Sequence, residues 1–307
     1  MTQWIDWELA LRTAKGLIPA GPMVSATEAA QIVAGLREAA QTGLQHAEEI
    51  SRLQSTGQAQ TLVVDRAGWA TAMSQNIQAM LPQLPKVPAA LPVIAGAEVG
   101  AVISVLSTRV LGQFDPFSGP RLLLNAPTIT QIRGELNLNA RDFYLWVATH
   151  EQTHRLQFEH APWIPSVFTE ALEQVFEGIG SGTHSMAQLA EKAKQISSEV
   201  GELTCIMSVL EGHAMVVMND VTTIGSIKTI RRRFAARGQN RSPLATWIGK
   251  LLGLDAKARQ YERGAKFVRH AVDAMGYEGF NRIFAARENF PNAAELDDPQ
   301  RWVERMS

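Results

Sequence analysis

The sequence predicts a mainly α-helical protein with a small β element. Apolar residues recur at helical spacing through most of the 307 residues, and only two short runs have the composition of β-strands. Apolar residues make up 46% of the chain and charged residues 19%, which is enough for a substantial buried core. We therefore expect a single α-rich unit over residues 1–307.

The N-terminal part of the chain is expected to contain three helices and two strands. Amphipathic patterns place helices near residues 4–14, 27–40 and 73–80, and Thr27 is suited to cap the second of them. Short strands are expected at Thr61–Val64 and Arg121–Leu124, the latter bounded by turns that contain proline. The proline-rich segment 82–92 is the best linker candidate, because repeated prolines favour an extended backbone.

The longest apolar run, Val93–Leu106, predicts a buried helix that is too short to span a bilayer. Gly96 and Gly100 lie one turn apart in this run, so another backbone could approach it closely. Acidic residues at positions 6 and 8 interrupt the N-terminal segment where a secretory signal would need apolar residues. We therefore expect a cytoplasmic protein with no membrane partner.

The charge balance and the cysteine content exclude several classes of protein. Since 29 Lys and Arg face 30 Asp and Glu, the formal charge is −1, and no net basic field exists to attract a nucleic acid. The single cysteine, Cys205, excludes an internal disulfide and any zinc knuckle built from several cysteines. It also fits a reducing compartment.

The most informative stretch is a predicted helix that begins after Asn139. This asparagine is a good N-cap, and an acidic residue three positions later lies in the first turn, where the helix dipole favours negative charge. Aromatic and aliphatic residues then recur at helical spacing until Pro162 ends the pattern. Inside this helix the residues His150 to His154 read H-E-x-x-H.

This spacing suits a metal ion. Residues four positions apart on a helix project from the same face, so the imidazoles of His150 and His154 can reach one Zn²⁺ ion. Glu151 lies about 100° around the helix from His150, where it can serve as a general base without binding the metal. A pair of histidines buried in a helical core is the competing interpretation, but each would then need a separate hydrogen-bond partner.

A third ligand must come from elsewhere in the chain. His160 lies where one zinc-peptidase class places its third histidine, but Gln157 replaces the glycine that the class requires. The apolar segment 204–220 is a better source, because a buried Glu211 without a cation would have to be protonated or unpaired. His213 is the rival on this segment, although residues two apart on one helix point about 200° away from each other. We predict Glu211 as the ligand, and we expect the small Gly212 beside it to let the two metal-binding helices approach closely.

Several motifs together resemble one known family. They are WELALRTAKGLIPAGP near the N-terminus, VVDRAGW, VLSTRVLGQFDPF, RDFYLWVATHEQTHRLQFEHAPWIP, VLEGHAMVVMND and LDAKARQYERGAKFVRHAV. With these motifs the chain is similar to the bacterial zincin-like metallopeptidases of type 2, often labelled as associated with biosynthesis of a deazaflavin cofactor. The resemblance implies a zincin-like fold with an HExxH active-site helix and a zinc ion, and it implies no particular substrate.

The expected function is zinc-dependent hydrolysis of a peptide or related amide bond, of the gluzincin type. The metal-site core is expected over about residues 139–220, with His150, His154 and Glu211 as ligands and Glu151 as the general base. His213 and Tyr261 are candidates to support the ligands, to face the substrate or to stabilise an oxyanion. Strand Arg121–Leu124 could offer a sheet edge to an extended peptide.

Two other classes of function compete with this expectation. One is a non-catalytic zincin fold whose cleft binds a partner, and the other is a metal-free helical interaction protein. Glu151 disfavours the first, because a purely structural metal would not require a base there.

Overall fold

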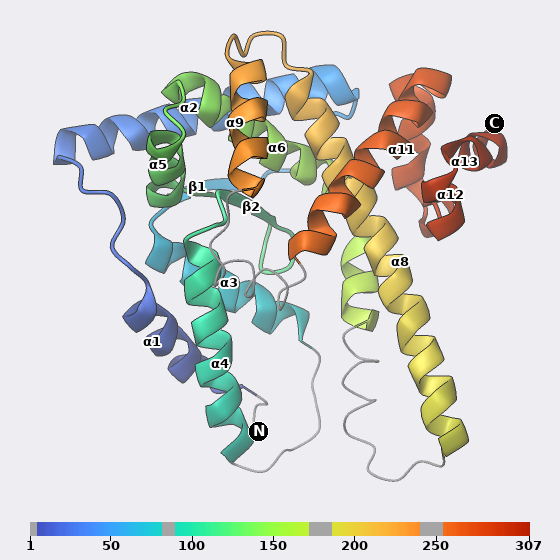
Figure 1. Cartoon of the computed structure of the whole chain (residues 1–307), viewed down its shortest axis with the longest axis horizontal. Helices are drawn as coiled ribbons and strands as arrows, with labels where there is room; N and C mark the ends of the chain where they lie inside the picture. The colour runs from blue at the N-terminus through green and yellow to red at the C-terminus, as the bar shows by residue number, and fades with distance from the viewer. Residues whose placement is uncertain (1–4, 82–89, 172–185, 240–253) are drawn as a thin grey trace. The chain divides into compact units, whose positions relative to one another are not determined.

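The computed structural model describes residues 5–81, 90–171, 186–239 and 254–307, and it confirms a mainly helical fold with a small sheet (Figure 1). The strands are β1 (Gln60–Val64), β2 (Gly112–Asp115) and β3 (Arg121–Asn125). The helices before the site are α1 (Trp7–Leu17), α2 (Ala26–Ser51), α3 (Arg66–Met80), α4 (Ala90–Ser107) and α5 (Ala126–Glu135). They are followed by α6 (Ala140–His160), α8 (Met186–Asn219), α9 (Ile227–Gln239), α11 (Leu254–Asn281), α12 (Ala293–Asp297) and α13 (Pro299–Met306).

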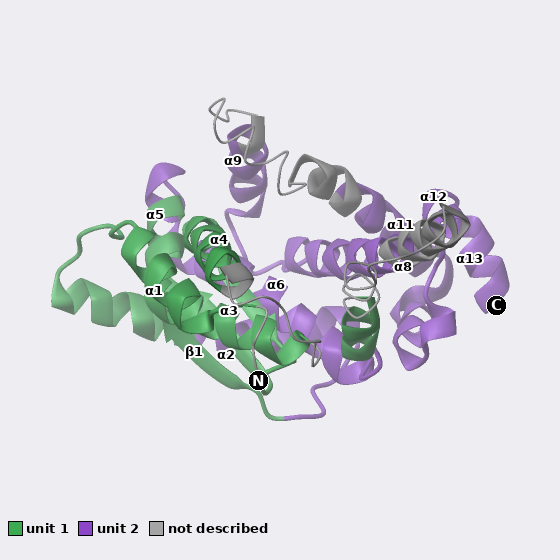
Figure 2. Ribbon diagram, turned by 90° about the horizontal axis from the view of Figure 1, so that it is seen from below, with its two compact units in different colours: residues 1–37, 58–132, 164–200 green, residues 38–57, 133–163, 201–307 purple. Residues whose placement is uncertain are grey.

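The chain divides into two compact units, which Figure 2 shows in green and purple. Unit 1 comprises residues 1–37, 58–132 and 164–200, and it contains the sheet. Unit 2 comprises residues 38–57, 133–163 and 201–307, and it contains α6 together with the C-terminal helices. Within the expected metal-site core, residues 139–163 and 201–220 belong to unit 2, whereas residues 164–200 belong to unit 1.

The sheet of unit 1 has the strand order β1-β3-β2. β1 pairs with β3 in parallel, with Gln60 opposite Arg121, and β2 pairs with β3 antiparallel, with Gly112 opposite Leu124. Both strands expected from the sequence are therefore present, and β2 is additional. The proposal that Arg121–Leu124 offers a free edge is wrong, because β3 is the central strand and its hydrogen-bonding groups face strands on both sides.

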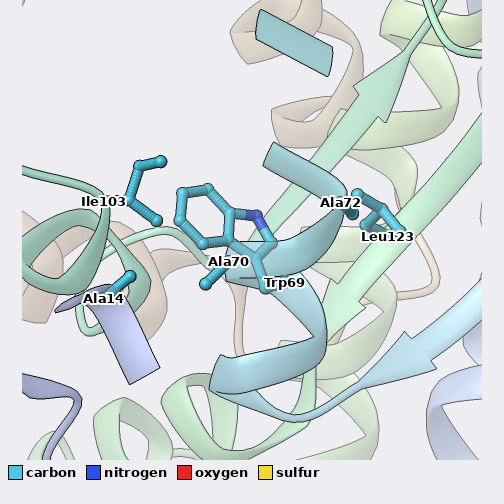
Figure 3. Packing of buried hydrophobic residues seen from close by; sticks show 6 residues of the cluster. All are labelled: Ala14, Trp69, Ala70, Ala72, Ile103 and Leu123. Carbon is cyan, nitrogen blue, oxygen red and sulfur yellow. The ribbon is translucent and has the colours of Figure 1, made fainter. Parts of the chain in front are cut away.

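Trp69 of α3 lies in the hydrophobic core of unit 1 (Figure 3). It clusters with Ala14 of α1, Ile103 of α4 and Leu123 of β3, so one indole ring is packed against three other elements. Its relative exposure is 1%. Replacing a buried tryptophan by alanine usually lowers the free energy of unfolding by about 3–5 kcal/mol, so Trp69 is a major contributor to the stability of this core. The motif VVDRAGW thus contains the end of β1 and the start of α3, and its tryptophan lies in the core.

Helix α4 approaches α1 closely, as its two glycines predict. A Cβ atom on Gly96 would overlap the backbone of Asp6, and one on Gly100 would overlap the backbone of Ala10. The expectation that the whole helix is buried is wrong, because Ile94 is 56% exposed and Val93 and Val102 are also exposed. Helix α4 is thus buried where it meets α1 and the core around Trp69, and it is exposed elsewhere.

Two boundaries differ from those expected from the sequence. α2 begins at Ala26, and the hydroxyl of Ser25, rather than that of Thr27, accepts the hydrogen bond from the Glu28 amide. The expected linker 82–92 falls mostly outside the described residues, but its end belongs to α4, which begins at Ala90. Pro92 is accommodated there because the first turn of a helix has no intrahelical partner for its amide groups.

Two glycine contacts set the helix packing of unit 2. Gly43 of α2 faces α6, where an added Cβ would lie 2.9 Å from the amide nitrogen of Thr149. Gly212 of α8 meets Gly264 of α11, and a Cβ on either residue would overlap the backbone of the other helix. The close neighbour of Gly212 is therefore α11 and not the HExxH helix, which corrects the expectation from the sequence.

Replacing Gly212 by alanine is expected to destabilise the protein by about 1–3 kcal/mol, the usual cost of overpacking. The matched control is Gly201→Ala on the same helix, because a Cβ on Gly201 meets nothing within 4 Å. Removing a helical glycine without a clash is expected to stabilise by about 0.5–1 kcal/mol. Urea unfolding measures both changes, and equal effects of the two variants would contradict the packing assigned to Gly212.

The part of α8 that enters unit 2 is strongly apolar. By length and composition the segment Gly201–Asn219 could cross a membrane, but 61% of it is buried within the protein, and core helices meet the same criterion. Ile206, Val209 and Leu210 are almost completely buried here. The apolar character of α8 is thus explained by packing, and it surrounds the few polar residues that the helix carries.

Candidate metal centre

Helix α6 begins where the sequence predicts. The Asn139 side chain accepts a hydrogen bond of 3.0 Å from the Asp142 amide, and the helix continues to His160. The Asp142 carboxylate in turn accepts a 2.7 Å hydrogen bond from the Ser226 amide, which ties the start of α6 to the chain before α9. The two histidines of the motif project one turn apart, with ring centroids 4.7 Å from each other.

The structure brings His150, His154 and Glu211 together. The Nε2 atoms of the two histidines are 3.1 Å apart, and Oε2 of Glu211 lies 3.5 Å from Nε2 of His150 and 3.8 Å from that of His154. The three donor atoms all lie within 4.8 Å of one another. Tetrahedral zinc with bonds of about 2.0–2.1 Å needs donor atoms about 3.3 Å apart, so this set fits a zinc ion.

The Glu211 carboxylate affects the two imidazoles differently. Burial alone would lower the pKa of His150, but the contact with Glu211 and the charge of Glu151 outweigh it, so the pKa of His150 is raised. Burial also lowers the pKa of His154, and here the charge of His150 adds to it, so the pKa stays below its usual value despite Glu211. A site with two adjacent carboxylates is electrostatically suited to a cation.

Glu151 is buried beside this cluster without belonging to it. It follows His150 directly in α6, and its charge acts on the His150 imidazole. Because successive helical residues diverge by about 100°, its carboxylate leaves the face that carries the two histidines. The charge of Glu151 therefore acts beside the His150 imidazole, while its carboxylate stays outside the group formed by His150, His154 and Glu211.

His213 lies in a different environment from Glu211, although both belong to α8. It is fully buried, and its ring packs 5.2 Å from that of Phe280 and 5.6 Å from that of Phe284, measured between centroids. Burial, with a smaller effect of His154, lowers the pKa of His213 to about 3. Its Nδ1 atom lies 3.0 Å from Nε2 of Gln157, so it contacts α6 through that side chain.

His160, another sequence candidate, is not brought to the cluster. His160 places its Nε2 atom 2.8 Å from the carbonyl oxygen of Gln54, and it is not part of the donor group found among the described residues. The helix continues through position 157, so no turn carries His160 back to the two histidines. The side chain of Tyr261 lies outside the part of the chain that the structure describes.

The last turns of α6 are fastened to the segment that follows α2. Arg155 forms a 2.7 Å ion pair with Glu159 and donates a hydrogen bond to the carbonyl of Gly57. Oε2 of Glu159 accepts a 2.8 Å hydrogen bond from the Thr56 amide. Hydrogen bonds to the Glu159 carboxylate lower its pKa despite partial burial. These contacts join the end of the HExxH helix to the segment that follows α2.

Gln157 contacts the candidate site, and the sequence analysis assigned it no role there. In the sequence, Gln157 was considered only as the residue that replaces a glycine. In the structure its side chain is fully buried and contacts His154, Leu210 and His213. One signal was available: residues three apart on a helix are neighbours, so a polar residue at position 157 can reach His154. The partners on α8 depend on tertiary packing.

The chain is similar to known proteins over most of its length. A family model described as zincin-like metallopeptidase matches residues 5–303. A crystal structure from Chloroflexus aurantiacus, described as "a putative hydrolase with a novel fold", superposes with a TM-score of 0.75 at 27% sequence identity and covers 98% of both chains. No curated protein matches the sequence. Because the family model spans nearly the whole chain, the protein belongs to the zincin-like metallopeptidase family.

Proposed function

We propose that this protein is a zinc-dependent hydrolase of the gluzincin type that cleaves a peptide or related amide bond. The observation that carries the proposal is the gathering of His150, His154 and Glu211 beside a buried Glu151. The family description supports a metallopeptidase, and the structural relative is described as a hydrolase. The two histidines and one glutamate form the ligand set of the thermolysin type of catalytic zinc site.

Each residue of the site has a distinct task in this proposal. His150, His154 and Glu211 would hold Zn²⁺, which when bound supplies a Lewis acid that activates water and polarises a carbonyl group. The carboxylate of Glu151 would accept a proton from the attacking water and deliver it to the nitrogen of the leaving amine. Glu151 is suited to this exchange because it is largely shielded from bulk water.

Metal analysis together with peptide cleavage tests the proposal. We expect the purified protein to contain about one zinc per chain, as a mononuclear site requires. Incubation with a peptide library followed by mass spectrometry is expected to reveal cleavage that a chelator abolishes and added zinc restores. Zinc without any cleavage would contradict hydrolysis and favour a non-catalytic partner-binding protein. Absence of zinc would contradict both functions and favour a metal-free helical interaction protein.

A further inference from the structure

The side-chain amide of Gln157 connects the two helices that carry the metal-binding residues. Its Nε2 atom lies 2.8 Å from the carbonyl oxygen of Leu210 and 3.0 Å from Nδ1 of His213, both on α8. Its Oε1 atom lies 2.8 Å from Nδ1 of His154 on α6. Leu210 directly precedes Glu211, so the amide links one ligand to the backbone beside another.

The Leu210 contact determines which way the amide points. A backbone carbonyl can only accept a hydrogen bond, so the atom of Gln157 that faces Leu210 must be the NH₂ nitrogen. The opposite orientation would place two oxygen atoms against each other at that distance. With the nitrogen on Leu210, the amide oxygen must face His154.

The orientation of the amide then determines the tautomer of His154. The amide oxygen can only accept, so Nδ1 of His154 must carry the hydrogen and donate it. In a neutral imidazole this leaves the lone pair on Nε2, which is the atom that faces His150 and Glu211. The hydrogen bond from Nδ1 to Gln157 therefore leaves Nε2 of His154 as the nitrogen whose lone pair is available to a metal.

His213 completes the arrangement by accepting the second amide hydrogen of Gln157 at Nδ1. All three hydrogen bonds lie in the interior, since Gln157 and His213 are both fully buried, so water does not compete for the amide. Nδ1 of His150, by contrast, has no hydrogen-bond partner among the described residues. Of the two histidines, His154 is therefore the one whose ring orientation is held in this way.

We propose that Gln157 is a positioning residue of the metal centre, which selects Nε2 of His154 for the metal and sets the register of α6 against α8, with His213 as its anchor. The inference rests on the proposed function and deepens it. The same amide donates a hydrogen bond to the carbonyl of Leu210, the residue that directly precedes Glu211 on α8. Partners that orient metal ligands in this way typically change metal affinity by about 10- to 100-fold when removed.

The variant Gln157→Met tests the proposal, because methionine keeps the length of the side chain and removes all three hydrogen bonds. The matched control is Gln152→Met on the same helix. Gln152 is also buried, and its Nε2 atom donates a 2.8 Å hydrogen bond to the carbonyl of Ala40 on α2, away from the ligands. Thermal unfolding of the zinc-free proteins measures what each variant loses in stability alone.

Zinc affinity, measured by competition with a chelator, is expected to fall about 10- to 100-fold in Gln157→Met and to stay within about twofold of the parent in Gln152→Met. In zinc-free parent protein, long-range ¹H–¹⁵N correlation spectra are expected to show His154 with its hydrogen on Nδ1. The His154 signals are assigned by their loss in His154→Ala.

Equal zinc affinities of the two methionine variants, or a hydrogen on Nε2 of His154 in the parent, would overturn the role of Gln157. The tautomer is read from the parent without metal, so this result decides the proposal even if Gln157→Met does not fold. Failure of the parent to bind zinc would overturn the proposed function instead, and the two failures are therefore distinguishable.

Discussion

Replacing Glu151 by glutamine is expected to lower the rate of hydrolysis by about 10²- to 10⁴-fold while the zinc content stays unchanged. The amide has nearly the shape of the carboxylate but cannot accept a proton from water at neutral pH. Zinc is retained because Glu151 lies outside the group formed by His150, His154 and Glu211. Cleavage kinetics on a peptide identified from the library, together with metal analysis of the same samples, measures both quantities.

The matched control is Glu159→Gln, which removes a partly buried carboxylate from the same helix. Glu159 pairs with Arg155 and with the Thr56 amide rather than with the metal-site residues. We expect this variant to be less stable and to keep the parent rate within about twofold, since it touches no reacting group. Hydrolysis by Glu151→Gln at the parent rate would refute the proposed base even if zinc were present.

Replacing Glu211 by alanine is expected to lower the zinc affinity by more than about 100-fold. Loss of a residue that only hydrogen-bonds to a metal ligand typically lowers the affinity by about 10- to 100-fold, and loss of a ligand should cost more. The reason is that the carboxylate would supply one of three donor atoms, with Oε2 3.5 Å from Nε2 of His150 and 3.8 Å from that of His154. His213→Ala is the comparison, because His213 is not part of the donor group and contacts α6 through the side chain of Gln157. We expect it to retain zinc at concentrations at which Glu211→Ala has lost it.

Chelator competition at a fixed temperature below the unfolding transition of each variant measures this order. Unfolding must be followed in parallel, because His213→Ala leaves a cavity among Phe280, Phe284 and Tyr277. The reverse order of affinities would make His213 the ligand and would refute the assignment of Glu211.

The local features of the site could be predicted from the sequence because helix geometry alone determines them. Asn139 is followed by an amphipathic pattern, and the histidines of the motif are four residues apart, so a capped helix with two imidazoles on one face follows directly. The sequence also favoured Glu211 over His213, because residues two apart on a helix cannot both face the same ion and a buried carboxylate without a cation would be protonated or unpaired.

The partners of these residues were decided only by the tertiary structure. Nothing in the local pattern shows that Gly212 packs on Gly264, or that His160 turns to the carbonyl of Gln54. The sheet is a second example. The composition of β3 does not show whether the strand is central or at an edge, and only its pairing with β2 in the folded protein makes it central. Such contacts join segments far apart in the chain, and they depend on topology rather than on spacing.

Gln157 combines both kinds of information. Its spacing from His154 is a property of one helix and was present in the sequence. Its contacts with Leu210 and His213 exist only because α8 packs against α6 in the folded protein. The sequence by itself indicated which residues can bind a metal, whereas tertiary packing decided which hydrogen-bond partners those residues have, because a hydrogen bond needs a partner at a defined distance and direction.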